Sequence, residues 1–187
     1  MANKLFMVML GGTPQGRHIE QHDIYFGIGT EIKDLAPHMM EFWPEVGPKL
    51  HMDAWREVTK VQNYNIEIVD RADCIENDLQ LFFINLGGYK QGIFNEFHYT
   101  YLLVAPSQKE AIQAVKNTSF YQEYNLPPQG YSHIDNKYGV DIDDIYEISE
   151  ILSNDFKQKY AIQITPSTEQ LPDDLITLGY MKLSSYL

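Results

Sequence analysis

The sequence predicts an α+β protein built by tandem duplication of one ββαββ unit, with antiparallel sheet, one main helix per copy and pseudo-two-fold symmetry. Three observations predict this fold. Residues 5–34 and 81–110 agree at eleven of thirty positions when they are aligned at an offset of 76. Both segments begin with a short apolar run that ends in two glycines, which is typical of a buried strand. Both continue with a segment rich in aromatic and branched residues, which indicates a second strand.

The first copy opens with a predicted strand over residues 5–10. A loop follows, and a second strand is expected over residues 20–28. Thr30 then caps a helix that extends to about residue 43, and Pro37 inside it means that the helix starts late or is kinked.

Residues 50–61 read as a third strand of the first copy. Gln62-Asn63 forms a tight turn, and residues 64–69 alternate cleanly between apolar and polar side chains. We therefore expect these two strands to pair as a hairpin.

The second copy repeats this order with clearer helix signals. Ser107 and Glu110 have the spacing of a capping box, and Ala111, Ile112 and Val115 form the expected buried stripe. Residues 118–139 are predicted to be an additional loop.

Two further alignments complete the second copy. Residues 139–152 match the third strand of the first copy at an offset of 90, and residues 159–165 match the fourth at an offset of 96. The growing offsets imply insertions of 14 and 6 residues, which we expect in loops. The predicted division is a first repeat over 1–79, a second over 80–165, and a C-terminal tail over 166–187 packed on the repeats as one further strand or helix.

Charge and cysteine content exclude several classes of partner. The net charge is −12 and the pI is about 4.8, which disfavours binding to phosphate backbones and to anionic lipid surfaces. The single cysteine, Cys74, forms no internal disulfide, which fits the cytoplasm. We expect no nucleic-acid or membrane partner, which leaves a small molecule or another protein.

Glutamate and histidine recur at one spacing in both copies. Glu20 and His22 lie two positions apart on a predicted strand and so share a face, as His51 and Asp53 do on another strand. If the strands are neighbours, the four groups converge. The candidate cluster also includes Arg17 and Asp23. Its second-copy counterparts are Glu96, His98, Asp141 and Asp143.

Three interpretations of these residues stay open. The histidines could brace the loop through their glutamates, which explains why both copies keep the pair. They could line a ligand site. They could also hold a divalent metal, or supply a general base with its orienting carboxylate. No residue is assigned as a metal ligand or a cofactor ligand, and no cofactor is predicted.

The glycine motif does not predict a phosphate loop. Gly11-Gly12 and Gly16 lack a following Lys-Ser/Thr pair, and a strand comes next where such a loop needs a helix. We expect a tight turn with positive φ instead.

The pattern GGxxxGxxxExH, with LHMDAW downstream, resembles a bacterial family catalogued as domain of unknown function 1543. The first copy carries the fuller motif, whereas the second has Ile93 and Tyr99 in place of Arg17 and Asp23. The resemblance implies one or two copies of such a unit and a bacterial source, and it brings no known activity. We expect a cytoplasmic binding or interaction module, with a small His/carboxylate enzyme as the alternative.

Overall fold

The computed structural model describes residues 2–89, 92–116, 142–168 and 172–186. The chain forms two compact units, which are described separately. Unit 1 comprises Met1–Ile75 and Leu152–Leu187, and unit 2 comprises Glu76–Ile151. The protein is α+β, and all strand pairs described below are antiparallel, as the sequence predicts.

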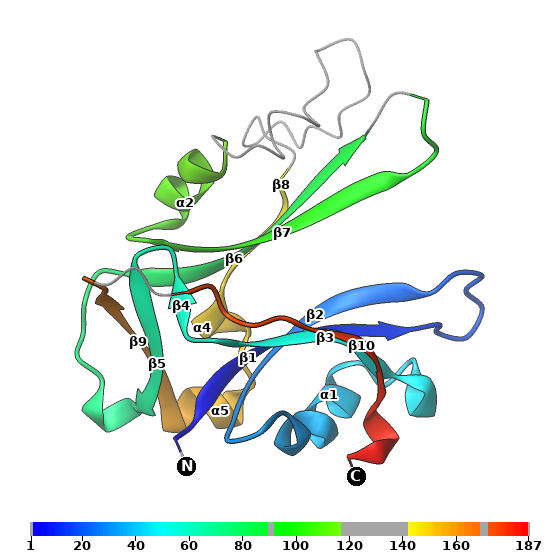
Figure 1. Ribbon diagram of the computed structural model, residues 1–187, viewed down its shortest axis with the longest axis horizontal. Helices are drawn as coiled ribbons and strands as arrows, with labels where there is room; N and C mark the ends of the chain where they lie inside the picture. Colours follow the sequence, from blue (N-terminus) through cyan, green and yellow to red (C-terminus); the bar gives the residue numbers. More distant parts are fainter. Residues whose placement is uncertain (1, 90–91, 117–141, 169–171, 187) are drawn as a thin grey trace. The chain divides into compact units, whose positions relative to one another are not determined.

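The main sheet of unit 1 has the order β10-β3-β1-β2 (Figure 1). The apolar run Leu5–Leu10 lies in the central strand β1, where both neighbours cover its backbone, and all of it except Met9 is buried. The bounds of the four strands are Lys4–Gly12 for β1, Gln21–Gly29 for β2, His51–Val58 for β3 and Thr177–Lys182 for β10.

The helical segment of unit 1 follows β2. A single 3-10 turn over Ile32–Leu35 leads into α1, Ala36–Phe42, so the helix starts late and Pro37 lies in its first turn, where a missing N–H is tolerated. The expected cap at Thr30 is wrong by one residue. Glu31 is the N-cap, and its backbone N–H donates to Asp34.

The expected hairpin between residues 50–61 and 64–69 is only partly correct. Its first strand divides into β3 and a short β4, Lys60–Val61, and only β4 pairs with β5, Tyr64–Asp70. Gln62 takes the positive φ of the turn, at 56°. β3 pairs instead with β1 and β10, because the chain bends at Thr59 between the two sheets.

Asp174 holds this bend from the C-terminal tail. Its carboxylate accepts hydrogen bonds from Thr59 N at 3.0 Å, from Thr59 Oγ1 and from Lys60 N at 3.3 Å. We expect Asp174→Ala to lower the free energy of unfolding by about 1–2 kcal/mol, because charge-assisted bonds are lost at a partly exposed site. Urea denaturation measures this, with the exposed neighbour Asp173→Ala as the control; equal effects of the two substitutions would contradict the assignment.

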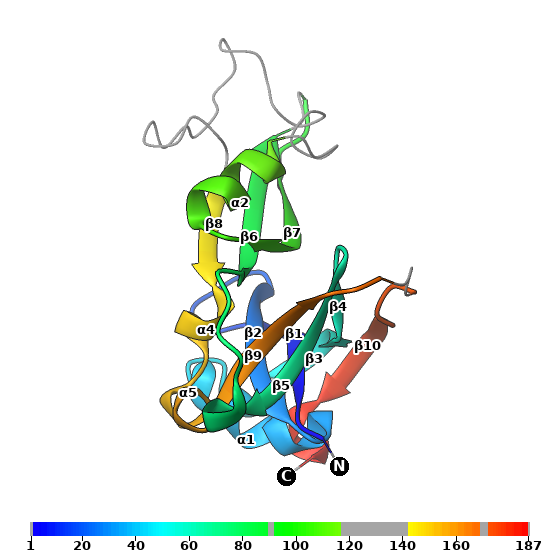
Figure 2. The ribbon, with the colours of Figure 1, turned by 90° about the vertical axis from the view of Figure 1, so that its left-hand side faces the viewer.

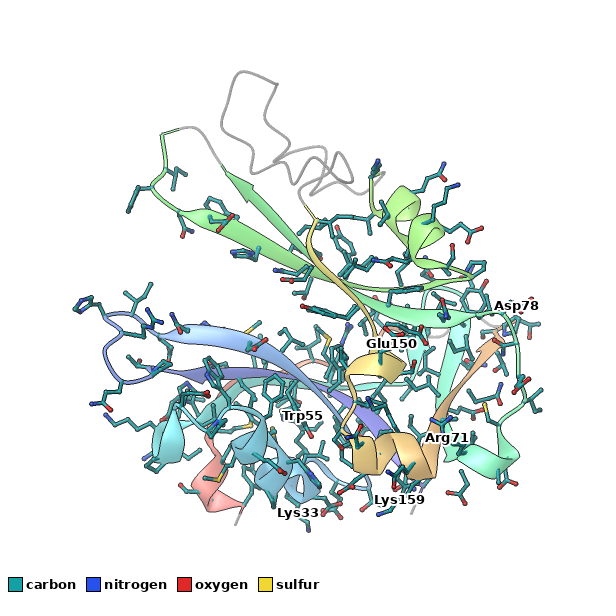
Figure 3. All side chains as sticks on the ribbon, turned by 180° about the vertical axis from the view of Figure 1, so that it is seen from behind. Lys33, Trp55, Arg71, Asp78, Glu150 and Lys159 are labelled. Atoms are coloured by element: carbon teal, nitrogen blue, oxygen red, sulfur yellow. The ribbon has the colours of Figure 1, made fainter. Side chains whose placement is uncertain are left out.

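β9, Tyr160–Pro166, joins β5 in the second sheet of unit 1, whose order is β4-β5-β9 (Figure 2). Glu67 of β5 pairs with Gln163 of β9, and the alignment of the two copies at an offset of 96 matches the same two residues. The pairing is therefore symmetric about this point, and the β5–β9 pair has a local two-fold axis. Arg71 follows β5 and donates from Nε to Lys157 O in the helix α5, Asn154–Lys159, whose last residue is labelled with Arg71 in Figure 3.

Unit 2 contains a sheet of order β7-β6-β8 and the helix α2. Ser107 caps α2 as predicted, and Ala111 and Val115 are buried while Ile112 is only half-buried. The bounds are Gln80–Tyr89 for β6, Glu96–Ala105 for β7, Gln108–Val115 for α2 and Ile142–Glu147 for β8. The predicted loop 118–139 lies outside the described residues.

The strand predicted over 139–152 ends earlier than expected. Ile148–Ile151 forms the short helix α4, which buries Ile148, and the Ser149 hydroxyl donates to Glu147 where the strand ends. The six-residue insertion predicted in a loop includes helix α5, Asn154–Lys159, in unit 1. Ser153 caps α5 and Phe156 is its buried anchor, so local capping and burial made a helix where we expected a loop.

The strand registers of the two units coincide. β6–β7 repeats the register of β1–β2 at the offset of 76, residue for residue. β6–β8 repeats the register of β1–β3, and both pairs carry a β-bulge at the same place, after Met9 in one and after Asn85 in the other.

The C-terminal tail contains the strand β10, and the sequence predicted one strand or one helix there. A 3-10 turn over Leu183–Ser185 follows the strand. β10 pairs with β3, with Leu178 opposite Ala54 and Met181 opposite Met52. It therefore forms an edge of the main sheet, and it carries exposed apolar side chains at Leu178 and Tyr180.

Candidate functional site

Four polar side chains of unit 1 converge at one end of the main sheet. We call them the His/carboxylate cluster: Glu20, His22, His51 and Asp53. The strand order explains their convergence, because Gly11 of the central strand β1 pairs with His22 on one side and with His51 on the other. The sequence predicted convergence only if the two strands were neighbours; they are not, because β1 lies between β2 and β3, and the four groups converge across β1.

Gly11 is the floor of the cluster. A Cβ at this position would collide with Asp53 Oδ2 and lie 2.6 Å from His51 Nε2, so only glycine leaves room for both groups. The adjacent Gly12 faces the other side, where a Cβ would collide with a methyl group of Val46.

The expectation of positive φ holds for only part of the glycine motif. Gly11 and Gly12 continue strand β1 and are required by close approach of side chains. The loop residue Gly16 has the positive φ, at 82°, and its counterpart Gly92 has 81°.

A β-bulge lies at Asp53, on the side of the cluster. The pairing of β1 with β3 passes from Met9–Ala54 to Leu10–Met52, which leaves Asp53 as the additional residue. Bulges of this kind re-aim a side chain locally. The carboxylate of Asp53 lies within 3.4 Å of both histidines.

The donor atoms of the cluster are separated by hydrogen-bond distances or slightly more. His22 Nε2 lies 3.1 Å from Asp53 Oδ2, and Asp53 Oδ2 lies 3.4 Å from His51 Nε2. His51 Nε2 is 3.0 Å from Glu20 Oε1, whereas His22 Nε2 is 4.0 Å from Glu20 Oε2. The closest carboxylate to His22 is thus Asp53, which comes from a different strand.

His51 is the anchor of the cluster. Its side chain is only 5% exposed, against 26% for Asp53 and about half for Glu20 and His22. His51 Nδ1 lies 2.9 Å from the carbonyl oxygen of Lys49, an acceptor, so Nδ1 carries the proton and donates it. Nε2 of the neutral ring then presents a lone pair to the cluster.

Two buried atoms of the cluster have no hydrogen-bond partner: His51 Nε2 and Asp53 Oδ2. The distances from these atoms to their neighbours are short enough for ion pairs. None of these contacts is a hydrogen bond, which also requires the donor to point at the acceptor. An unpaired buried polar atom is unfavourable by about 1–3 kcal/mol. The cluster therefore has unused binding capacity.

Tyr180 adds an aromatic wall that sequence reasoning missed. Its ring centroid lies 4.2 Å from that of His51, and the side chain is largely exposed. The register of β10 on β3 brings it there, since Lys182 pairs with His51. The tail has no counterpart in the repeat, so no sequence signal could place this residue.

Arg17 and Asp23 do not join the cluster. Asp23 follows His22 directly on β2 and so faces the opposite side of the strand, where it accepts a hydrogen bond from the backbone of Ile24. Arg17 lies in the exposed loop before β2, and its side chain takes part in no ion pair within the described part of the chain. The structure therefore brings together four of the six candidate residues of the first copy, without these two.

In the second copy, the described side chains are those of Glu96 and His98, the counterparts of Glu20 and His22. His98 Nε2 lies 3.6 Å from Glu96 Oε2, and its Nδ1 is 3.5 Å from Asn85 Nδ2. Asp141 lies outside the described residues, and so does the side chain of Asp143, whose backbone belongs to β8. Like His22, His98 is about half exposed, so any brace that these histidines form with their glutamates lies at the surface.

Two features are absent from the described residues, a preformed metal site and a membrane-spanning helix. Among them, no group of three or more His, Cys, Asp or Glu side chains has the arrangement of a metal site. Over the same residues, no helix is long and apolar enough to span a membrane.

Part of the chain matches a known family model. Residues 17–68 match the model of the family described as Domain of Unknown Function (DUF1543), which supports the resemblance seen in the motif. The match spans all four residues of the His/carboxylate cluster. A comparison with curated proteins gives no match.

One solved structure is similar over almost the whole chain. It is the crystal structure of a protein Il1583 from Idiomarina loihiensis, with a TM-score of 0.65, 23% sequence identity and coverage of 97% of each chain. At this identity the similarity shows the fold alone.

Proposed function

We propose that this protein is a binding module and that the His/carboxylate cluster is its ligand site. One observation carries the proposal: buried His51 Nε2 and Asp53 Oδ2 lack hydrogen bonds, although they lie beside two half-exposed side chains. Buried polar groups without partners are rare in folded proteins and are enriched where a ligand supplies the missing interaction. The exposure of Glu20 and His22 gives a ligand access from solvent.

The chemistry of the site favours a small cation. Glu20 and Asp53 contribute two carboxylates, and His51 presents a lone pair because its Nδ1–H donates to Lys49 O. All three groups are acceptors, so a ligand must supply positive charge or hydrogen-bond donors. The aromatic ring of Tyr180 on His51 is also compatible with a cation.

A small enzyme is the second candidate, and one distance favours it. His22 Nε2 lies 3.1 Å from Asp53 Oδ2, so a small rotation would form the hydrogen bond by which a carboxylate orients a general base. The half-exposed imidazole of His22 could then act on a substrate bound over Gly11.

We also propose that the chain arose by tandem duplication of a ββαββ unit, with a first repeat over 1–79, a second over 80–165 and the tail 166–187. The shared strand registers and the shared β-bulge support this proposal, because unrelated strands have no reason to match in both. The local two-fold axis of the β5–β9 pair supports the pseudo-two-fold relation of the copies, since it joins the last strand of each.

The negative charge of the protein and its resemblance to a bacterial family support a proposal about its partners and location. With a net charge of −12, we propose that the protein binds neither nucleic acid nor membrane and acts in the bacterial cytoplasm on a small molecule or a protein.

A pair of matched histidine variants tests the ligand site. Because both imidazoles are about half exposed, His22→Ala and His98→Ala should each lower the free energy of unfolding by less than about 1 kcal/mol. Thermal melts against a panel of metal ions, amines and common metabolites should show a rise in Tm that His98→Ala retains and His22→Ala loses. A rise that depends on His98 and not on His22 would place the site in the second copy.

A further inference from the structure

We infer that the ligand of the His/carboxylate cluster is a first-row transition-metal ion such as Zn²⁺, held by His22 Nε2, His51 Nε2 and Asp53 Oδ2, with Glu20 as the fourth group. This inference rests on the proposed function and names the ligand class of the same site. Two imidazoles and two carboxylates are donors that suit such ions better than Mg²⁺ or Ca²⁺, which prefer oxygen.

The orientation of His51 is the first observation for a metal. A metal-binding histidine usually donates its other ring N–H to a backbone carbonyl or a carboxylate, which fixes the tautomer and turns the free nitrogen toward the ion. His51 has this arrangement, with Nδ1 at 2.9 Å from Lys49 O. Its Nε2 is buried, has no hydrogen-bond partner and faces Asp53 and Glu20.

The separations between donor atoms are the second observation. Around a tetrahedral ion with bonds of about 2.0–2.1 Å, neighbouring donors lie about 3.3–3.4 Å apart. The cluster has 3.1 Å between His22 and Asp53, 3.4 Å between Asp53 and His51, and 3.0 Å between His51 and Glu20.

An organic ammonium ion fits these separations less well. Acceptors that share one ammonium group at ordinary hydrogen-bond distances lie about 4.6 Å apart, well beyond the values in the cluster. Carboxylate oxygens and a nitrogen lone pair at 3.0–3.4 Å also repel one another unless a charge lies between them. A compact ion with short bonds relieves this repulsion best.

Binding requires the two exposed side chains to move. As they stand, no three of the donors have the arrangement of a metal site within the described residues, and His22 Nε2 is still 4.0 Å from Glu20 Oε2. Glu20 and His22 lie at the loop end of the β1–β2 pair, where about half of each side chain is in solvent. Rotation of these two exposed side chains would bring them onto His51 and Asp53, for which Gly11 leaves room.

The test is a titration of the full chain, freed of metal with a chelator. Zn²⁺ and Ni²⁺ should bind with one-to-one stoichiometry in calorimetry and raise Tm by roughly 5–10 °C at a hundred-fold excess over Kd. Co²⁺ should give the visible absorption of a tetrahedral complex. Mg²⁺ and Ca²⁺ should give no rise, and affinity for Zn²⁺ should fall in acid, because protons compete for both imidazoles.

Matched variants locate the ion. His22→Ala and Asp53→Asn should weaken Zn²⁺ binding by about 100-fold or more, beyond the 10–100-fold loss expected for an outer partner. His98→Ala has the same strand position in the second copy, and Asp23→Asn lies next to His22 on the opposite face. Both controls should bind Zn²⁺ like the unmodified chain.

Two results would overturn the metal assignment. One is the absence of one-to-one binding of Zn²⁺, Ni²⁺ and Co²⁺ by the unmodified chain; the other is binding that His22→Ala and Asp53→Asn both retain. If an amine or a metabolite then raised Tm in a way that required His22, the proposed ligand site would stand and only the metal would be wrong. If no ligand at all depended on His22 or Asp53, the proposed function would fail as well.

Discussion

Gly11→Ala is expected to abolish the rise in Tm that Zn²⁺ produces while leaving the protein folded. The added methyl group would collide with Asp53 Oδ2 and lie 2.6 Å from His51 Nε2, so the Asp53 side chain must turn away from the cluster. Gly11 lies in a regular strand without positive φ, so the backbone tolerates alanine. The expected loss of stability is about 1–3 kcal/mol, as for other overpacked sites.

Gly12→Ala is the matched control for Gly11→Ala. Its methyl group would collide with Val46 on the other face of the same strand, so a similar loss of stability is expected. The Zn²⁺ response should survive, because the cluster lies on the face of Gly11. Thermal melts of both variants with and without Zn²⁺ make the comparison. Equal loss of the response in the two variants would show that general destabilisation, and not the floor of the cluster, is responsible.

Leu10→Ala and Leu86→Ala are each expected to lower the free energy of unfolding by about 2–5 kcal/mol. The two leucines are counterparts at the offset of 76, and both are at most 1% exposed. Leu86 belongs to the apolar core of unit 2, which is formed by Phe82, Ile84, Leu86, Leu103, Ala105, Ala111 and Val115. Removing either side chain leaves a cavity in the core, because the surrounding structure relaxes only partly.

Urea denaturation followed by circular dichroism measures both losses. Met9→Ala is the control, because Met9 precedes Leu10 on β1 and is 36% exposed, so its loss should be clearly smaller. Leu86→Ala should also retain the Zn²⁺ response, because the cluster lies in unit 1. If Leu10→Ala lowered the free energy of unfolding no more than Met9→Ala does, the buried position of Leu10 in β1 would be contradicted.

Local sequence signals predicted the local elements well. The apolar run before Gly11 is a buried strand, Pro37 does mark a late helix start, and Ser107 does cap α2. These features depend on residues close in sequence, namely hydrophobic period, cap chemistry and the missing N–H of proline. Two errors were also local, the cap placed at Thr30 and the loop that is helix α5. The larger errors concern which distant strand each strand pairs with.

The strand predicted over 50–61 shows this limit. Its alternation is compatible with pairing to the next segment, and the sequence contains no sign that most of it joins β1 and β10 instead. The bend at Thr59 depends on Asp174, more than a hundred residues away in the chain. A hydrogen bond of that span leaves no periodic pattern for sequence reasoning to detect.

The candidate site divides in the same way. The sequence by itself determined which residue types recur, that Glu20 shares a face with His22, and that His51 shares one with Asp53, because side chains alternate along a strand. The tertiary structure alone decided that β1 lies between these strands, that a bulge lies at Asp53, that Gly11 is the floor and that Tyr180 joins from the tail. It also separated Arg17 and Asp23 from the cluster. Proximity across strands follows from sheet order and register, and these depend on the packing of the whole unit and not on the spacing of residues within any one segment.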